Sequence, residues 1–316
     1  MHYTIRHITK FTYEAPISES VMEARMQPRS DALQHCIRFG LSTMPSSRVR
    51  VYQDADGNMV HHFNIPGRHS RLTVTAEAFV ECAAPPGLPD TLGANAWERL
   101  DVATATGEFW DTLNPSPFAK PTDLLSAFTG EIGLARGADP IATLRTLMAD
   151  LFSRFEYRTE STRVDSPIDD ALSSRQGVCQ DFAHVMIALV RQLGIPCRYV
   201  SGYFYQPADA HERSSSDGAT HAWIEAWLLD LGWVGFDPTH NSLAGEHHIR
   251  VAVGRDYADV PPTRGVFKGL SVARSELAVG VSVGATQVYT DPASFTPWMS
   301  REAASPLESA ESQQQQ

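Results

Sequence analysis

The sequence predicts an α+β fold in which a β-rich N-terminal part precedes a part that mixes helices with strands. Apolar and polar residues alternate within residues 3–13 and 71–80, which is typical of strands with one buried face. From about residue 97 the spacing of the apolar residues becomes helical. Between residues 179 and 237 an amphipathic helix is followed by two short strands rich in aromatic side chains.

The first 85 residues are expected to form the β-rich domain. Its first strand covers residues 3–13. Residues 48–53 and 59–65 flank a turn of Asp, Ala, Gly and Asn residues, a composition that predicts a hairpin. Residues 71–80 are expected to add a further strand, so the domain 1–85 is a sheet.

A proline-rich break follows, and it separates this sheet from a helical connecting region over residues 86–150. The pair Asp139-Pro140 is a typical helix start. The third region, residues 151–300, is expected to hold a second core and to end in a late strand that alternates over 277–283. Residues 301–316 finish in four glutamines and are expected to be a disordered tail. The helix after Asp139 is predicted from apolar residues at helical spacing: Ile141, Leu144, Leu147, Met148, Leu151 and Phe152.

Composition and charge exclude several classes of protein. The formal net charge of -11 disfavours nucleic acid or an anionic membrane surface as the main partner. No run of about 18 apolar residues is present, and the N-terminus lacks the apolar stretch of a signal peptide, so the cytoplasm is the expected location. The four cysteines show no C-x-x-C spacing, which in a reducing compartment predicts free thiols, one reactive and three inert.

Cys179 lies where a glycine-containing turn enters an amphipathic helix. Apolar residues recur at helical spacing from Phe182 until Gly194-Ile195-Pro196 ends the helix. The partial positive charge of a helix start favours a thiolate, and the unpaired amides there can receive an oxyanion. Gly177 allows the chain to approach closely just before the helix. The alternative is that Cys179 is a small buried apolar residue, as many free cysteines are.

His221 and Asp237 lie in two strands that are expected to pair as a hairpin. The first strand begins with His221, and Asp237 closes the second. A turn centred on Leu229 would set His221 and Asp237 directly opposite each other on one face. An aspartate in that position can accept the imidazole N–H and stabilise an imidazolium paired with a thiolate. Alone, each residue would more often be structural; together with Cys179 they predict a catalytic triad.

Four short motifs surround these residues: G-V-C-Q-D-F-A-H at 177–184, S-G-Y at 201–203, T-H-A-W at 220–223 and G-W-V-G-F-D-P-T at 232–239. They resemble the core of the transglutaminase-like superfamily, in its bacterial cysteine-peptidase-like branch. Residues 254–262 and, more loosely, the first 85 residues are also similar to that branch. The resemblance implies a papain-like or transglutaminase-like core, in which a helix bearing the cysteine packs on an antiparallel sheet bearing the histidine and the aspartate. It further implies Cys179 as nucleophile, His221 as general base and acid, and Asp237 as the residue that orients the imidazole.

Other residues near the motifs have both structural and functional interpretations. The main-chain N–H of Gln180, or that of the nucleophile, could serve an oxyanion hole. Asp181 suits a structural role in the first helical turn. His184 lies about 140° around the helix from the nucleophile and is poorly placed as the base. Trp223 and Trp233 either wall a substrate groove or pack in the core.

No metal site and no cofactor are predicted. The polar segment 210–219 is either a gate over the active site or a plain surface loop. Cys197 is expected to be inert within a strand. The histidine and acidic residues of the C-terminal third fit no compact ligand motif such as H-E-x-x-H: His211, Glu212, His240, Glu246, His247 and His248.

The sequence therefore predicts a thiol hydrolase that cleaves peptide or isopeptide-like amide bonds through a thioester on Cys179. Capture of the same thioester by an amine would be transglutamination, and hydrolysis is preferred because the branch it resembles is peptidase-like. A non-catalytic peptide-binding module and a metal-dependent hydrolase are the alternatives from other classes. The expected partner is a protein or peptide substrate, with no nucleic acid and no membrane, and the oligomeric state is left open.

Overall fold

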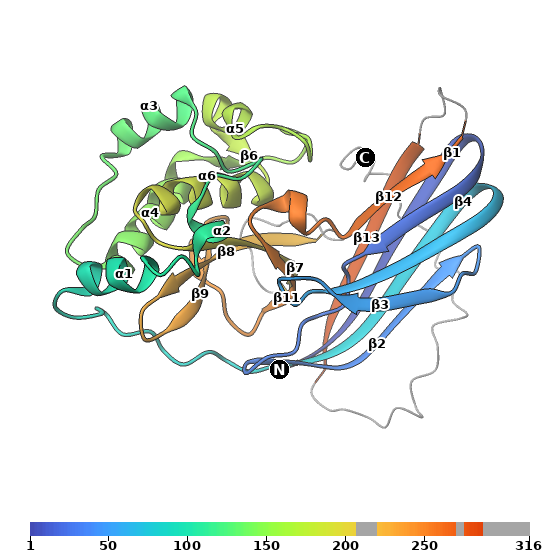
Figure 1. The fold of residues 1–316 in the computed structure, drawn as a ribbon, viewed down its shortest axis with the longest axis horizontal. Helices are drawn as coiled ribbons and strands as arrows, with labels where there is room; N and C mark the ends of the chain where they lie inside the picture. The colour runs from blue at the N-terminus through green and yellow to red at the C-terminus, as the bar shows by residue number, and fades with distance from the viewer. Residues whose placement is uncertain (207–219, 270–274, 287–316) are drawn as a thin grey trace.

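The computed structural model describes residues 1–206, 220–269 and 275–286. The predicted tail, residues 301–316, and the whole polar segment 210–219 lie outside the described residues. The described chain forms a sheet-rich part and a part of helices packed on a second sheet, and the two lie side by side (Figure 1).

The N-terminal part is a six-stranded antiparallel sheet with the order β12-β1-β4-β2, in which β13 also pairs with β1 and β3 with β4. Alternate residues of β1 are buried from Tyr3 onward, as the alternation of the sequence predicts. The expected hairpin is also present, with Val49 opposite Phe63. The strands are β1 (His2–Ala24), β2 (Gln34–Met44), β3 (Val49–Gln53), β4 (Met59–Cys82), β12 (Thr263–Lys268) and β13 (Ser275–Thr286).

Two features of this sheet differ from the prediction. The strands expected at 59–65 and 71–80 are one continuous strand, β4, because the chain stays extended through Pro66 and pairs there with Glu19 of β1. In addition, the sequence grouped residues 263–286 with the second core, whereas β12 and β13 both pair with β1. The chain thus leaves the N-terminal sheet after β4 and returns to it at the end (Figure 1).

In the second part of the described chain, α6 packs on a five-stranded antiparallel sheet with the order β10-β9-β8-β7-β11, and other helices pack around α6. Asp139 caps α4 as predicted, since its carboxylate accepts the N–H of Ile141 at 2.9 Å. The helices are α1 (Ala96–Thr104), α2 (Trp110–Leu113), α3 (Asp123–Ile132), α4 (Pro140–Arg154), α5 (Ile168–Ser174) and α6 (Cys179–Gln192). The sheet strands are β7 (Cys197–Phe204), β8 (His221–Leu228), β9 (Gly232–Asp237), β10 (Ser242–Leu243) and β11 (His248–Gly254); β5 (Glu156–Tyr157), β6 (Gln176–Gly177) and the short helix η1 (Tyr257–Asp259) complete the part.

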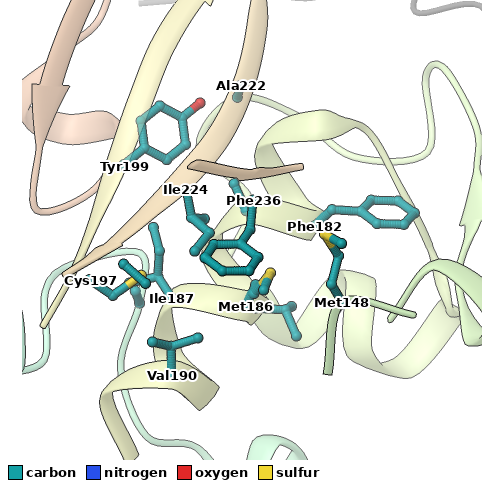
Figure 2. Packing of buried hydrophobic residues seen from close by; sticks show 14 of the residues in the cluster. Met148, Phe182, Met186, Ile187, Val190, Cys197, Tyr199, Ala222, Ile224 and Phe236 are labelled. Atoms are coloured by element: carbon teal, nitrogen blue, oxygen red, sulfur yellow. The ribbon is translucent and has the colours of Figure 1, made fainter. Parts of the chain in front are cut away.

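Helix α6 is the central element of this core. Every residue from Gln180 to Arg191 is buried, because the sheet covers one side of the helix and other helices cover the rest. Met186 and Ile187 meet Ile224 of β8 and Phe236 of β9 (Figure 2). This packing fixes the start of α6, and therefore Cys179, relative to the sheet.

The N-terminal part is attached along β11, the edge strand of the second sheet. The carboxamide of Asn58 donates to the carbonyl of Val253 and accepts its N–H, both at 2.8 Å. Gln34 does the same with the carbonyl and N–H of Arg250, again at 2.8 Å. Two side-chain amides thus substitute for a neighbouring strand and satisfy an edge that would otherwise be open.

The segment after β11 is structural. Hydrogen bonds of this segment connect α6 with the loop between α2 and α3. The buried carboxylate of Asp256 accepts the N–H of Phe118 at 2.8 Å. Arg191 of α6 is buried and donates to the carbonyl of Arg255 at 2.7 Å. His184 accepts the N–H of Tyr257 at 3.2 Å, so this histidine packs within the core.

Candidate active site

Cys179 is the first residue of α6, as predicted, and is half-buried. The carboxylate of Asp181 accepts the N–H of Val178 at 2.8 Å and also a hydrogen bond from Thr162. A Cβ atom on Gly177 would lie 2.7 Å from the Cβ of Asp181, so the turn requires a glycine there. Burial raises the pKa of Asp181 to about 6 despite these hydrogen bonds. Asp181 therefore has the structural role that the sequence suggested.

His221 begins β8, and its side chain is buried with that of Asp237. The Nε2 atom of His221 lies 2.8 Å from Oδ2 of Asp237. The Nδ1 atom is buried and has no hydrogen-bond partner among the described residues. The thiol of Cys179 lies near enough to this imidazole to raise its pKa. The structure thus brings two of the residues that the sequence singled out, His221 and Asp237, into hydrogen-bond contact, and the thiol of Cys179 lies near the same imidazole.

The hairpin that carries His221 and Asp237 has a different register from the predicted one. Leu228 pairs with Gly232, so the turn is centred on Asp230 and not on Leu229. The backbone explains the difference, because Asp230 and Gly232 both take positive φ angles, 68° and 73°. If this register continues, Asp237 lies two positions before the residue that is directly opposite His221. The two side chains still share a face and meet diagonally.

Asp237 is the most heavily coordinated side chain of the site. Its Oδ1 atom accepts the backbone N–H groups of Thr239 and His240 at 2.9 and 3.3 Å. Its Oδ2 atom lies near three imidazoles, at 2.8 Å from His221 and His240 and 3.0 Å from His248. Burial would raise the pKa of this carboxyl, but His221 and the other hydrogen bonds hold it well below its usual range. Asp237 is therefore an ionised carboxylate in a buried position.

The tautomer of His248 follows from its partners. Its Nδ1 atom accepts the N–H of Gly245 at 3.1 Å, so the proton is on Nε2, which donates to Asp237. The ring of Phe204 packs against the imidazoles of His221, His240 and His248, with centroid distances from 4.6 to 5.3 Å. His240 and His248 were noticed in the sequence only as metal ligands that fit no motif, and their contact with Asp237 was not predicted.

The charge state of His221 follows from the same contacts. Burial alone lowers its pKa, but the charge and hydrogen bond of Asp237, together with the interaction with Cys179, outweigh burial and raise the pKa to about 10. The imidazole is consequently protonated at neutral pH. A protonated imidazole beside a thiol can hold a thiolate as an ion pair and can later donate its proton to a leaving group.

The other cysteines have the inert character that the sequence predicted. All four cysteines are free thiols. Burial raises the pKa of Cys36 and Cys82 to about 11 and that of Cys197 to about 12, which disfavours their thiolates. Cys179 differs from them in lying near an imidazole, that of His221.

The remaining candidates have structural contacts. Gln180 donates from its side chain to the carbonyl of Val164 at 2.8 Å. Trp223 is fully buried, while Trp233 lies beneath the guanidinium of Arg198 at 4.1 Å.

The same cluster of side chains was also considered as a metal site. His211 and Glu212 lie outside the described residues. Potential ligand atoms of His221, Asp237 and His240 lie within 4.8 Å of one another. Because both imidazoles are hydrogen-bonded to Oδ2 of Asp237, the cluster is accounted for by hydrogen bonding.

Two family descriptions and several relatives match this chain. Residues 131–238 match the transglutaminase-like superfamily, and residues 3–81 match the bacterial transglutaminase-like N-terminal region. An uncharacterized protein of Mycobacterium leprae is 34% identical over 276 residues, which cover 87% of this chain and 96% of that protein. The chain belongs to the transglutaminase-like superfamily.

Two further similarities are informative for this transglutaminase-like protein. A solved structure from Cytophaga hutchinsonii, named "Putative Cysteine Protease", has a TM-score of 0.67 over 91% of this chain and 93% of its own, at 21% identity, and therefore shows the shared fold. A protein-glutamine gamma-glutamyltransferase of Pseudomonas aeruginosa is 32% identical over 106 residues, which cover 30% of this chain and 16% of that protein. Within the described residues, no helix is long and apolar enough to cross a membrane.

Proposed function

We propose that this protein is a thiol hydrolase that cleaves peptide or isopeptide-like amide bonds, with Cys179 as nucleophile, His221 as acid and base, and Asp237 as the orienting carboxylate. The observation that carries the proposal is the position of His221, whose Nε2 is hydrogen-bonded to the ionised Asp237 and whose pKa is raised by Asp237 and by the nearby Cys179 thiol. Three residues in this order, two of them buried, are the arrangement that activates a thiol for attack on an acyl carbon.

The reaction follows from the protonation states. The sulfur of Cys179 attacks the amide carbon, a C–S bond forms, and the carbonyl oxygen becomes an oxyanion. The backbone N–H of Cys179 is the first of α6 and has no helical acceptor, so it can donate to that oxygen. His221 then gives its proton to the leaving nitrogen as the C–N bond breaks, which leaves a thioester and a neutral imidazole.

The second half of the reaction decides the product. The neutral His221 accepts a proton from water, and the hydroxide formed displaces the sulfur as a thiolate, which gives a carboxylic acid and restores the thiolate beside the protonated His221. An amine in place of water would give a new amide, which is transglutamination. The similarity to the Pseudomonas aeruginosa gamma-glutamyltransferase supports that second candidate.

One assay separates the candidates. The wild-type chain and the variants Cys179→Ala and Cys36→Ala are incubated with denatured casein, with and without a fluorescent primary amine. Hydrolysis predicts new amino termini or free carboxylates that do not require the amine, whereas transglutamination predicts incorporation of the amine. Both predict loss in Cys179→Ala and retention in Cys36→Ala. If Cys179→Ala matches the wild type in both readouts, the enzyme proposal fails and a non-catalytic peptide-binding module is favoured.

A further inference from the structure

The turn that leads into Cys179 is bound by the segment between β5 and α5. β5 pairs in parallel with β6, which ends directly before the turn. The N–H of Arg158 donates to the carbonyl of Gly177 at 3.0 Å, and the side chain of Gln180 donates to the carbonyl of Val164 at 2.8 Å. The segment therefore contacts the chain both before and after the nucleophile.

Asp181 is the side chain that joins this segment to the turn. It is buried, and its Oδ2 atom accepts both the N–H of Val178 at 2.8 Å and the hydroxyl of Thr162. The peptide group that follows Val178 carries the N–H of Cys179, which is the donor proposed above for the oxyanion. The carboxylate of Asp181 therefore holds the residue that sets the direction of this N–H.

The ionised form of Asp181 holds the turn more firmly than the neutral form. Hydrogen bonds to a charged acceptor are roughly twice as strong as those between neutral groups. A negative charge in the first turn of α6 is also favoured by the partial positive charge of the helix start. Protonation weakens the bonds to Val178 and Thr162 together, because both donors share one carboxylate oxygen. Since an oxyanion donor is effective only when its direction is fixed in advance, the charge on Asp181 bears on the rate.

This charge lowers the stability of the folded chain. Burial raises the pKa of Asp181 from 3.8 to about 6, although the hydrogen bonds from Thr162 and Val178 oppose the shift. Between these two values the folded chain keeps a proton that the unfolded chain releases. The stability contributed by neutral Asp181 is therefore complete below pH 3.8 and is lost as the pH rises through 6. An asparagine could accept from the same two donors without this loss, and groups with strongly shifted pKa values are concentrated at functional sites.

The groups around Asp181 show which charge can be changed without touching the turn. Asp170 of α5 is exposed, and its negative charge contributes to the raised pKa of Asp181. Tyr199 of β7 also interacts with Asp181, but it is buried and stays neutral because its pKa lies well above 10. On α6 the neighbouring titratable groups are Cys179 and His184, and burial lowers the pKa of His184 to about 3. Removal of the charge of Asp170 therefore changes the ionisation of Asp181 and leaves the contacts of the turn in place.

We propose that Asp181 is a positioning residue of the reaction. Its ionised carboxylate holds the turn before Cys179 against the segment after β5 and directs the N–H of Cys179 toward the oxyanion, so the full rate requires Asp181 to be ionised. Asp181 acts through Val178 and not on the substrate. The inference rests on the proposed function of Cys179.

The first test is the pH dependence of Cys179-dependent turnover of denatured casein between about pH 5 and 8, in the wild type and in Asp181→Asn. The asparagine has the shape of the aspartate and fixes its neutral state. We expect the wild-type rate to fall as the pH drops through about 6. The variant should be about tenfold slower at pH 8 and should lack this fall. Asp230→Asn, at the exposed turn between β8 and β9, is the matched control and should follow the wild type.

Two further readouts separate positioning from support of the fold. Alkylation of Cys179 by iodoacetamide forms no oxyanion, so its rate should not fall in Asp181→Asn, whereas amide turnover should. The variant should also unfold at the same temperature as the wild type or at a higher one at pH 8, because it carries no buried charge at this position. A merely structural carboxylate would lower both rates and the unfolding temperature.

A second set of variants changes the ionisation of Asp181 and leaves its side chain in place. Thr162→Val removes a donor to the carboxylate, so the pH at which the rate falls should rise. Thr162→Ser retains the hydroxyl and should restore the wild-type profile. Asp170→Asn removes a nearby negative charge, so the same pH should decrease, with the rate at pH 8 unchanged. The opposite directions of the two shifts would identify Asp181 as the titrating group.

Equal turnover by the wild type and Asp181→Asn at pH 8, or a fall below pH 6 that is as steep in the variant as in the wild type, would overturn the inference. So would a parallel loss of turnover, alkylation and thermal stability. A wild type without Cys179-dependent turnover would instead count against the proposed function, and the inference would fall with it. The two failures are distinguishable, because the first requires an active wild type.

Discussion

Nε2 of His248 donates to Oδ2 of Asp237 at 3.0 Å, while Nδ1 of the same ring accepts the N–H of Gly245 at 3.1 Å. The ring is thus held from both sides, and β11 contributes to the orientation of a carboxylate at the end of β9. This contact lies outside the three residues of the triad, yet it acts on the residue that positions His221.

His248→Ala should lower turnover roughly tenfold, because Asp237 loses a buried donor worth about 1 kcal/mol or slightly more. His248→Gln retains an N–H donor and should recover most of the activity. The neighbouring His247 is only half-buried and contacts Tyr205, so His247→Ala is the matched control and should leave turnover unchanged. Steady-state kinetics on a peptide substrate give the comparison, and equal rates for His248→Ala and His247→Ala would contradict the role of His248.

Asp237→Asn should have a much larger effect, a loss on the order of 10²–10⁴ in turnover. The amide is neutral and cannot accept from three imidazoles, so the pKa of His221 should fall from its value of about 10. NMR titration of the His221 ring together with the rate constant tests this. Asp230→Asn, at the exposed turn of the same hairpin, serves as the control. Retention of both the raised pKa and the rate in Asp237→Asn would refute the assignment.

Asn58→Ala should destabilise the chain by about 2–4 kcal/mol, because it leaves the buried N–H and carbonyl of Val253 without partners. Asn64→Ala is the matched control, since Asn64 is exposed and bonds to Glu19 on the surface. Denaturant unfolding measures both variants, and a difference of less than about 0.5 kcal/mol between them would mean that the edge of β11 is satisfied in another way.

His184 predicts a specific acid sensitivity. Burial lowers the pKa of His184 to about 3, aided by the charge of Arg191, whereas in the unfolded chain it is near 6.5. Between these two pKa values, His184 binds a proton in the unfolded state but not in the folded state. The stability contributed by neutral His184 is therefore complete above pH 6.5 and is lost as the pH falls toward 3. His184→Gln retains an acceptor for the N–H of Tyr257. Between pH 6 and 4, the free energy of unfolding of this variant should fall less steeply than that of the wild type. The two slopes should differ by about 1.4 kcal/mol per pH unit. Parallel curves for the two proteins would contradict this assignment.

The sequence predicted the α+β fold class and the contact of His221 with Asp237 because each of the residues it singled out lies in a distinctive local context. Cys179 follows a glycine turn at a helix start, and His221 and Asp237 are at strand ends. The register of the hairpin was wrong because it depends on which turn residues adopt positive φ. Several residues near the turn could do so, and in the structure Asp230 does.

The pairing of strands that are far apart along the chain was the second feature that could not be predicted from the sequence. The alternation of β13 showed a strand but not its partner, and the pairing with β1 joins residues more than 260 positions apart, such as His2 and Thr286. The contact of His248 with Asp237 was hidden for the same reason, because β11 pairs with β7 and not with β9. β2 was not predicted as a strand, since much of it is exposed and it presents no clear apolar face.

The central claim is that His221 activates the thiol of Cys179. The most direct test is the rate of iodoacetamide labelling at neutral pH, with the labelled cysteine located by mass spectrometry, in the wild type, His221→Ala and His247→Ala. We expect fast labelling confined to Cys179, slowed about tenfold or more in His221→Ala and unchanged in His247→Ala. Labelling of Cys179 at the same rate with and without His221, or no faster than that of Cys36, would contradict it.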